Sequence, residues 1–285
     1  ARGRGIASMG LTEYDQAVQY FTEALELSDG WVQNVDYDMN YYLAAAYRKN
    51  GQPAEAKKVY DAILGLKPEE KDAYFLRGSA ELELGDYESA KADFDKAISM
   101  DPKNYDRLIE IYEALADYGY REVGQEYLQN VLNTDKKLDA YDSGRIYYYL
   151  GDYQKAYLAL EEAKGKGGVD SYLYLGKAYA ATGDYNYASS VYSNYLSKQG
   201  PDAEIYNQLG LCEMAKKDYQ KALEAFQAGK QIEGNSLMQT LSFNEIVAYE
   251  YLQDYQKAAV LLKAYLQNYP DDQAAIREQQ FLSTR

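Results

Sequence analysis

Residues Lys71–Asn104 read KDAYFLRGSAELELGDYESAKADFDKAISMDPKN, and this stretch of 34 residues decides the fold. Apolar side chains recur at helical spacing over residues 72–84 and predict a first helix. Gly85 can adopt the left-handed conformation that ends a helix. Asp86 can cap a second helix by accepting a hydrogen bond from a free backbone N–H. Pro102 follows that helix and stops it. The stretch therefore predicts a helical hairpin.

The same pattern returns along the chain at near-constant intervals. The phrase DYQKA occurs at Asp152–Ala156, Asp218–Ala222 and Asp254–Ala258. A catalytic motif needs to occur once, whereas a phrase that recurs in this way marks a structural unit copied along the chain. The predicted copies are residues 1–36, 37–70, 71–104, 105–136, 137–168, 169–202, 203–238 and 239–272, with approximate boundaries.

The key residues of the quoted stretch have the spacing of the tetratricopeptide repeat, and they are Tyr74, Gly78, Ala90, Phe94, Ala97 and Pro102. The chain therefore resembles the tetratricopeptide repeat (TPR) family over nearly its whole length. The resemblance implies an all-α fold, a right-handed α-solenoid of about eight helix-turn-helix repeats over residues 1–272. Its first helices would line a concave groove, and residues 273–285 would form a C-terminal capping helix.

The position of Ala1 within its repeat suggests that the chain is part of a longer protein. Ala1 falls inside the first helix of its repeat, and about five extra residues surround Trp31. The Tyr-, Gln- and Asp-rich repeats resemble TPR lipoproteins of Gram-positive, clostridia-like bacteria, with phrases such as YNQLGLCEM and NEIVAYEYLQDYQKA. In those proteins a signal peptide and a lipid-modified cysteine precede the repeats. This resemblance favours an extracytoplasmic, membrane-anchored location after trimming, with a cytoplasmic protein as the alternative.

Composition excludes several classes of function. The net charge is −15 without any run of Lys or Arg, which argues against nucleic-acid binding. The chain has no histidine, so it lacks the commonest general base and the commonest zinc ligand. No run of about 18 apolar residues is present to span a membrane. The sole cysteine, Cys212, falls in a predicted helix and is expected to be a small buried residue.

No sequence motif indicates catalysis. The chain contains no G-x-S-x-G, H-E-x-x-H or G-x-x-x-x-G-K-[ST] pattern. Asp36–Asn40, DYDMN, has the opening spacing of a calcium loop but lacks the central glycine and the closing glutamate. We therefore expect a protein that is not an enzyme and that needs no cofactor or metal.

Tyrosine is abundant, with 34 residues in 285. Many of these tyrosines recur at two positions of the repeat, where a ring can bury its body while its hydroxyl reaches the edge. They include Tyr14, Tyr87, Tyr153, Tyr185, Tyr219 and Tyr255 at one position, and Tyr47, Tyr147, Tyr179 and Tyr249 at the other. Helix packing accounts for many of the tyrosines, but not for all.

The resemblance implies that a peptide partner would contact the concave face of the first helices. The candidate groove residues are Tyr41, Phe75, Ile109, Tyr141, Arg145, Tyr148, Tyr149, Lys177, Asn207, Phe243 and Tyr251. The groove positions of peptide-binding TPR proteins also correspond to Ala45, Arg48, Ser79 and Leu82 in this chain. Aromatic side chains suit recognition because they offer a large contact area at low entropic cost. Alternatively, these rings pack against neighbouring helices.

Two charge features bear on the choice of partner. Acidic residues recur near the starts of the first helices, at Asp38, Asp72, Asp106, Asp170 and Glu204. They either attract a basic peptide or favour helix N-termini through the macrodipole, and we prefer the second interpretation. The Lys/Asn/Arg clamp of chaperone-binding relatives is replaced by Tyr41, Ala45, Leu76, Asp106 and Glu110. We therefore do not expect binding of chaperone tails.

Three functional hypotheses remain. The leading one is a protein-protein interaction scaffold that binds an extended peptide segment of an unidentified protein in a concave, Tyr-rich groove. The second is a surface carbohydrate-binding protein that stacks tyrosines on sugar faces. The third is a purely structural or oligomerising solenoid, for which self-association would be the signature.

Overall fold

The computed structural model describes residues 1–27 and 34–284, and in these residues every regular element is an α-helix. The predicted all-α helical repeat is confirmed. Trp31 and the extra residues around it lie outside the described residues. The first eight helices are α1 (Arg2–Gly10), α2 (Tyr14–Glu26), α3 (Asn34–Lys49), α4 (Pro53–Leu66), α5 (Lys71–Glu83), α6 (Tyr87–Met100), α7 (Tyr105–Asp117) and α8 (Arg121–Thr134). The remaining helices are α9 (Ala140–Tyr149), α10 (Tyr153–Glu162), α11 (Gly168–Ala181), α12 (Tyr185–Gln199), α13 (Ala203–Ala215), α14 (Tyr219–Lys230), α15 (Met238–Tyr251), α16 (Tyr255–Asn268) and α17 (Gln273–Leu282).

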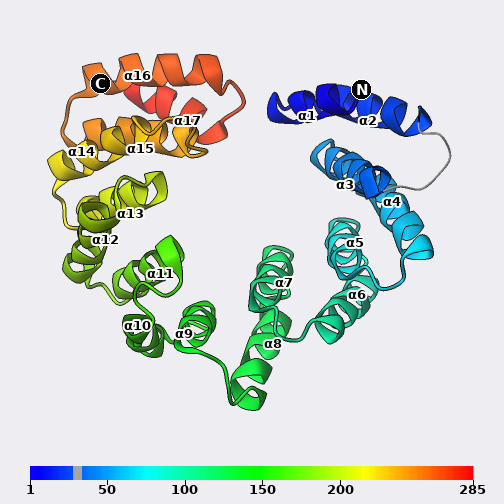
Figure 1. Cartoon of the computed structure of the whole chain (residues 1–285). Helices are drawn as coiled ribbons and strands as arrows, with labels where there is room; N and C mark the ends of the chain where they lie inside the picture. The colour runs from blue at the N-terminus through cyan, green and yellow to red at the C-terminus, as the bar shows by residue number, and fades with distance from the viewer. Residues whose placement is uncertain (28–33, 285) are drawn as a thin grey trace. The chain divides into compact units, whose positions relative to one another are not determined.

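The chain divides into two compact units, Ala1–Asn133 and Thr134–Arg285, called unit 1 and unit 2 below. Within unit 1, α3, α5 and α7 form one row and α4 and α6 form a second row behind it (Figure 1). Within unit 2, α9, α11 and α13 form a row, with α10, α12 and α14 behind (Figure 1). Each unit is therefore a stack of helical pairs. The boundaries of the individual repeats stay a prediction.

The turn between α5 and α6 shows how the repeated phrase works. Gly85 has φ +78° and ends α5 in the left-handed conformation, as predicted. The Asp86 backbone N–H then donates to the Glu81 carbonyl at 2.9 Å, which satisfies a carbonyl at the end of α5. The Asp86 carboxylate accepts from the Ser89 backbone N–H at 3.3 Å and caps α6. The GDY phrase is thus a helix stop followed by a helix start.

The same turn position is left-handed in every helical pair from α1–α2 to α15–α16. The residues that occupy it are Thr12, Gly51, Gly85, Gly119, Gly151, Gly183, Lys217 and Gln253. A residue with a Cβ pays a steric penalty in this conformation, whereas glycine does not. Three of the turns therefore carry a small strain that the sequence analysis did not anticipate.

Exchanging the residues of two equivalent turns tests this strain. Lys217 (φ +65°) and Gly151 (φ +80°) each precede the same DYQKA phrase. We expect Lys217→Gly to raise the free energy of unfolding by about 0.5–1 kcal/mol, because it relieves the strain. The matched Gly151→Lys should lower it by a similar amount. Urea unfolding followed by circular dichroism measures both, and changes of the same sign would contradict the explanation.

Small residues let paired helices approach closely. A Cβ built on Gly78 of α5 would lie 2.8 Å from a ring carbon of Phe94 on α6. Phe94 and Ala90 are fully buried in a cluster that also contains Leu82 and Leu115. Gly78, Ala90 and Phe94, which share the spacing of the repeat, thus meet at the contact between α5 and α6. The core is therefore a series of such clusters, each shared by adjacent helices.

Tyrosine packing follows two modes. Tyr60 and Tyr192 are fully buried and fill the place that Phe94 takes in its own helical pair. Others stack on one another, as Tyr87 does on Tyr120 with ring centroids 4.1 Å apart and Tyr157 on Tyr179 at 4.5 Å. Offset ring pairs of this kind add to the stability that burial provides. Packing between helices therefore uses many of the tyrosines.

A charge network joins α4, α5 and α6 in unit 1. Arg77 of α5 donates to Asp61 of α4 at 2.7 Å and to Asp93 of α6 at 2.6 and 2.8 Å. Glu81 of α5 is 3% exposed and lies 3.5 Å from the amine of Lys57. Its Oε2 atom is buried without a hydrogen-bond partner in the described residues. The network holds three helices together but leaves one carboxyl poorly solvated.

In unit 2, α13 carries the chain's sole cysteine. Cys212 is 4% exposed and packs in a cluster with Ala188, Tyr192 and Ile205. Burial raises the pKa of its thiol to about 11, and the neighbouring Glu213 carboxylate adds to the rise. The prediction that Cys212 is a small buried residue is confirmed.

Candidate functional site

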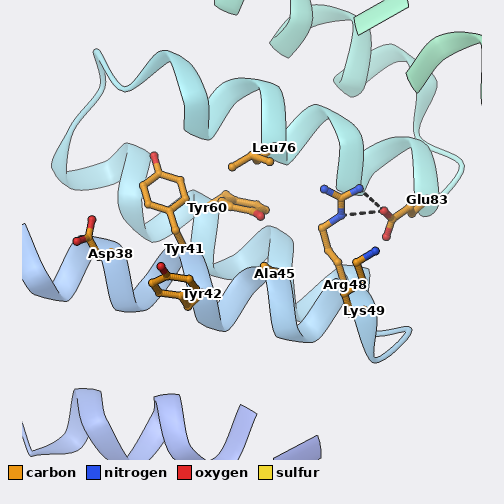
Figure 2. Close-up of a pocket in the computed structure, with 9 residues that line it drawn as sticks. All are labelled: Asp38, Tyr41, Tyr42, Ala45, Arg48, Lys49, Tyr60, Leu76 and Glu83. Carbon is orange, nitrogen blue, oxygen red and sulfur yellow. Dashed lines mark hydrogen bonds and ion pairs between the residues drawn. The ribbon is translucent and has the colours of Figure 1, made fainter. Parts of the chain in front are cut away.

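Unit 1 contains a surface pocket of about 740 Å³ on the α3–α5 side of its helical row (Figure 2). We call it the α3–α5 pocket. Its lining consists of Asp38, Tyr41, Tyr42, Ala45, Arg48 and Lys49 from α3, Tyr60 from α4, and Leu76 and Glu83 from α5. Its volume is within the range of pockets that hold small molecules or large side chains.

The α3 residues of the pocket share one face of the helix. They are spaced by three or four residues, with two adjacent pairs, and this spacing produces a single stripe along α3. The opposite face of α3 is buried, with Leu43, Ala44 and Ala46 in the core. The amphipathic sequence of α3 therefore fixes which side chains are presented to the pocket.

Tyrosine rings form the inner wall of the pocket. Tyr60 is 1% exposed, and its ring centroid lies 6.3 Å from that of Tyr41. Burial raises the pKa of Tyr60 to about 12, and the nearby Arg48 guanidinium opposes part of this rise. Burial also raises the pKa of Tyr41, with contributions from the Glu70 and Asp72 carboxylates. Both hydroxyls therefore stay protonated at neutral pH.

The two ends of the pocket differ in charge. At one end the Arg48 Nε donates to Glu83 Oε1 at 2.8 Å, and the Arg48 Nη2 donates to the same oxygen. Lys49 is exposed beside this pair and forms no ion pair within the described part of the chain. Asp38 lies at the other end (Figure 2). The centre between these ends is apolar, with Ala45 and Leu76.

The predicted groove residues of unit 1 are in different environments. Tyr41 lines the pocket, together with Ala45 and Arg48. Phe75 does not line it, because its ring packs 6.1 Å from Phe94 and under the Arg107 guanidinium, 4.0 Å from its centroid. Ile109 is 4% exposed and therefore also turned into the core.

In unit 2 the structure brings Tyr148 and Tyr149 of α9 together with Tyr174 of α11. The ring centroids of Tyr148 and Tyr149 are 5.5 Å apart, and those of Tyr148 and Tyr174 are 5.6 Å apart. The hydroxyls of Tyr149 and Tyr174 lie 3.0 Å from each other. The predicted groove residues Tyr148 and Tyr149 thus contact the neighbouring helix α11 through Tyr174, which was not among the predicted residues.

Two other predicted residues of α9 pair with each other. The Arg145 guanidinium lies 4.4 Å from the ring centroid of Tyr141, and its Nη2 donates to Asp142 at 2.6 Å. Arg145 is only 7% exposed. The Arg145 guanidinium therefore interacts mainly with Tyr141 and Asp142 of its own helix and is little exposed to solvent.

The remaining predicted residues lie farther along unit 2 and each contacts a neighbour there. These contacts are Lys177 with Glu204 at 3.6 Å, Asn207 with Asn244 at 2.9 Å, Phe243 with Tyr265 at 5.7 Å between centroids, and Tyr251 with Tyr219 at 4.9 Å. Asn207 is 5% exposed, whereas Tyr251 is 56% exposed. Tyr251 is therefore the most accessible of these four residues.

Six residues of the α3–α5 pocket were absent from the candidate groove list. They are Asp38, Tyr42, Lys49, Tyr60, Leu76 and Glu83. Four of the six come directly after a residue that was predicted to line the groove, as Leu76 follows Phe75 and Lys49 follows Arg48. The stripe that faces the pocket is therefore shifted by about one residue, a shift that helical periodicity alone leaves open.

Two further kinds of feature, a metal-binding cluster and a membrane-spanning helix, are absent from the described residues. No group of three or more His, Cys, Asp or Glu side chains in residues 1–27 and 34–284 is arranged to hold a metal ion. Among the helices described there, none combines the length and the apolar character that crossing a bilayer requires.

Curated relatives match short parts of this chain. The Hsp70-Hsp90 organizing protein of Triticum aestivum is 30% identical over 105 residues, which is 36% of this chain and 17% of that protein. An FK506-binding protein-like protein of Mus musculus is 42% identical over 62 residues, which is 22% of this chain and 18% of that protein. The matches therefore span less than a fifth of the length of either relative.

Solved structures share the fold at low identity. A tetratricopeptide repeat protein from Parabacteroides merdae has a TM-score of 0.54 at 14% identity, covering 86% of this chain and 96% of its own. A chain of the APC/C hetero-tetramer Cut9–Hcn1 has a TM-score of 0.52 at 16% identity, covering 98% of this chain and 54% of its own.

Family models give the most direct assignment. A tetratricopeptide repeat model matches residues 2–56, 41–105 and 173–236, which together make up more than half of the chain. A second tetratricopeptide repeat model matches residues 243–272. With the helical pairs, the left-handed turns and the paired small and aromatic residues described above, these matches show that the chain belongs to the tetratricopeptide repeat family.

Proposed function

We propose that this protein is a non-enzymatic interaction scaffold that binds an extended segment of a partner protein, and that the α3–α5 pocket is its principal contact site. The observation that carries the proposal is the pocket itself, about 740 Å³ in volume and lined by one stripe of α3 and two residues of α5. Tetratricopeptide repeat proteins generally mediate protein–protein interaction, which supports the assignment.

The chemistry of the pocket suits a side chain of a polypeptide. Tyr41, Tyr42 and Leu76 offer apolar surface at the centre, where an apolar side chain of the partner would lose contact with water. Arg48, paired with Glu83, is held in place at one end and can donate to a backbone carbonyl without much further loss of freedom. Apolar anchors in pockets dominate the energetics of protein interfaces.

The carbohydrate alternative has less support. A sugar ring needs the open face of an aromatic side chain. The closely stacked tyrosines of this chain, such as Tyr157 with Tyr179 and Tyr219 with Tyr251, direct ring faces at one another. The resemblance to clostridia-like lipoproteins and the extracytoplasmic location stay predictions.

Filling the pocket tests the proposal. Ala45 lines the pocket and is only partly buried, so an arginine side chain at this position would extend into it. Selection from a phage library of random dodecapeptides should enrich sequences on the wild-type protein. We expect Ala45→Arg to weaken binding of the best selected peptide by about tenfold or more in a fluorescence-polarisation titration.

A matched variant separates pocket filling from any general effect of the new charge. Ala62→Arg makes the same change at an exposed site of α4, outside the pocket lining. It should bind the peptide as the wild type does. Equal loss in both variants, equal binding by both, or failure of the wild type to enrich any peptide would each contradict the proposal.

A further inference from the structure

The helix α17 packs on α15 and α16 of unit 2 through apolar side chains. Ala275 and Leu282 of α17 share a buried cluster with Ile246 of α15 and Leu262 of α16. Figure 1 shows α17 next to both of these helices. The cluster attaches α17 near its start, at Ala275, and again near its end, at Leu282.

Two carboxyl groups meet at the contact between α15 and α17. Glu250 lies near the end of α15, Glu278 lies in the second half of α17, and both side chains are partly buried. The Oε1 atom of Glu250 is buried and meets no hydrogen-bond donor in the described residues. The Glu250 side chain is instead hydrogen-bonded to that of Glu278. Because ionised carboxylates only accept hydrogen bonds, this bond requires a proton on one of the two groups.

No positive charge compensates Glu250. Glu278 is the only titratable group of the described residues whose charge acts on it. Helix α15 has no basic residue, and those of α14, α16 and α17 are Lys221, Lys230, Lys257, Lys263 and Arg277. The first two of these are ion-paired with other carboxylates, and the other three are exposed. The contact therefore holds two acidic groups and no base.

Ionisation of both carboxyls opposes the packing of α17. Burial raises the pKa of Glu250 from 4.5 to about 7, and the charge and hydrogen bond of Glu278 contribute to the rise. The packed state therefore retains a proton that an open state releases to solvent between pH 4.5 and pH 7. The contact is strongest below this range, weakens as the pH rises through it, and is weakest above pH 7.

The start of α17 is attached in a way that does not need this proton. The Asp272 carboxylate caps α17 by accepting from the backbone N–H groups of Ala274 at 2.9 Å and Ala275 at 3.1 Å. It also accepts from the Tyr265 hydroxyl of α16, and this bond lowers the pKa of Asp272. Asp272 thus stays ionised from weakly acidic to alkaline pH, and the start of α17 keeps its attachment.

We propose that a proton shared by Glu250 and Glu278 holds the second half of α17 against α15, and that loss of this proton lets this half separate while Asp272 keeps the helix start in place. Separation uncovers apolar surface of Ile246 and Leu262. The contact is a pH-dependent device within unit 2, and it does not depend on the α3–α5 pocket of unit 1.

Amide hydrogen exchange, resolved by residue with NMR, measures the separation at pH 5.5 and pH 8. Dividing the intrinsic exchange rate at each pH by the observed rate gives a protection factor that is free of the pH dependence of exchange itself. Because about 1.5 pH units separate pH 5.5 from the pKa of Glu250, the fall in protection is limited to about thirtyfold. We expect protection over residues 278–282 to fall about tenfold, and protection within α13 to stay unchanged.

Three variants test the role of the proton. In Glu250→Gln the side-chain amide donates to Glu278 at either pH, so protection over residues 278–282 should differ by less than about twofold between pH 5.5 and pH 8. Glu278→Lys replaces the repulsion by an attraction and should give higher protection at pH 8 than the wild type. Glu233→Gln, an exposed change between α14 and α15, is the control and should retain the tenfold fall.

Each of three results would overturn the proposal. The first is equal protection of residues 278–282 at both pH values in the wild type. The second is a Glu250→Gln protein that keeps the full pH dependence. The third is an equal fall within α13, which would show that unit 2 opens as a whole and that α17 does not move by itself.

Discussion

Phe226→Ala is expected to lower the free energy of unfolding of unit 2 by about 3–5 kcal/mol. The Phe226 ring is fully buried in α14 and belongs to a cluster with Ala222, Leu223 and Leu241. Its removal takes away apolar contacts and leaves a cavity that rigid helices fill only in part. No other single truncation discussed for this chain should cost more.

The partner glycine of Phe226 turns this prediction into a stricter test. A Cβ built on Gly210 of α13 would lie 2.3 Å from a ring carbon of Phe226. Gly210→Ala alone should therefore cost about 1–3 kcal/mol through overpacking. In the Phe226→Ala background the same change should cost almost nothing, because the ring that it would meet is gone.

Urea unfolding of the wild type, both single variants and the double variant measures this coupling. Gly65→Ala serves as the control, since a Cβ on this α4 glycine meets nothing within 4 Å. It should be neutral or slightly stabilising, because alanine is the better helix former. Strictly additive effects of Gly210→Ala and Phe226→Ala would show that the close approach of α13 and α14 is not the constraint.

Glu81→Gln is expected to make unit 1 clearly more stable than the wild type at pH 8. At pH 5 the same substitution should stabilise unit 1 only slightly. The pKa of Glu81 is raised from 4.5 to about 7 by burial first and by the Asp93 carboxylate second, while Lys57 and Arg77 oppose part of the rise. Below about pH 4.5 the carboxyl is protonated in both the folded and the unfolded state, and it contributes no pH dependence.

Between pH 4.5 and pH 7 the folded state retains a proton that the unfolded state releases. Stability must therefore fall as the pH rises through this window, and the full penalty is present above pH 7. Because one pH unit corresponds to about 1.4 kcal/mol, the rise of the Glu81 pKa from 4.5 to about 7 sets an upper bound of about 3 kcal/mol on the stabilisation by Glu81→Gln at pH 8. Glutamine keeps the shape of the side chain without the charge.

Urea midpoints at pH 5 and pH 8 measure the effect. Glu88→Gln, an exposed change on α6, is the control and should show the same small difference at both pH values. If the urea midpoints of Glu81→Gln and the wild type differed by the same amount at pH 5 and at pH 8, ionisation of the buried Glu81 carboxyl would not destabilise the fold.

Local features of the fold were predictable from the sequence. The turn at Gly85 and Asp86 depends on a backbone conformation and a cap that lie within a few residues of each other. The contact between Gly78 and Phe94 lies within one helical pair, where the small and the large residue recur at constant spacing. Short-range rules are sufficient in both cases, because no distant part of the chain decides the outcome.

The candidate site was predicted less well because it depends on how neighbouring repeats rotate against each other. Helical periodicity gives a broad face of α5 but does not say whether Phe75 or Leu76 points into the groove. The structure shows Phe75 held against Phe94 and Arg107, so Leu76 takes the place in the pocket. The Arg48–Glu83 pair joins residues 35 positions apart, and no local pattern marks it.

The buried thiol of α13 makes this protein its own reporter of local opening. Cys212 is the chain's sole cysteine, and its high pKa leaves almost no thiolate at neutral pH. An alkylating reagent reacts with the thiolate, so modification has to wait until α13 separates from α12. Pulsed alkylation then measures the rate at which this part of unit 2 opens in the native protein, without any added label. Any cysteine introduced on the surface for a dye would react long before this one.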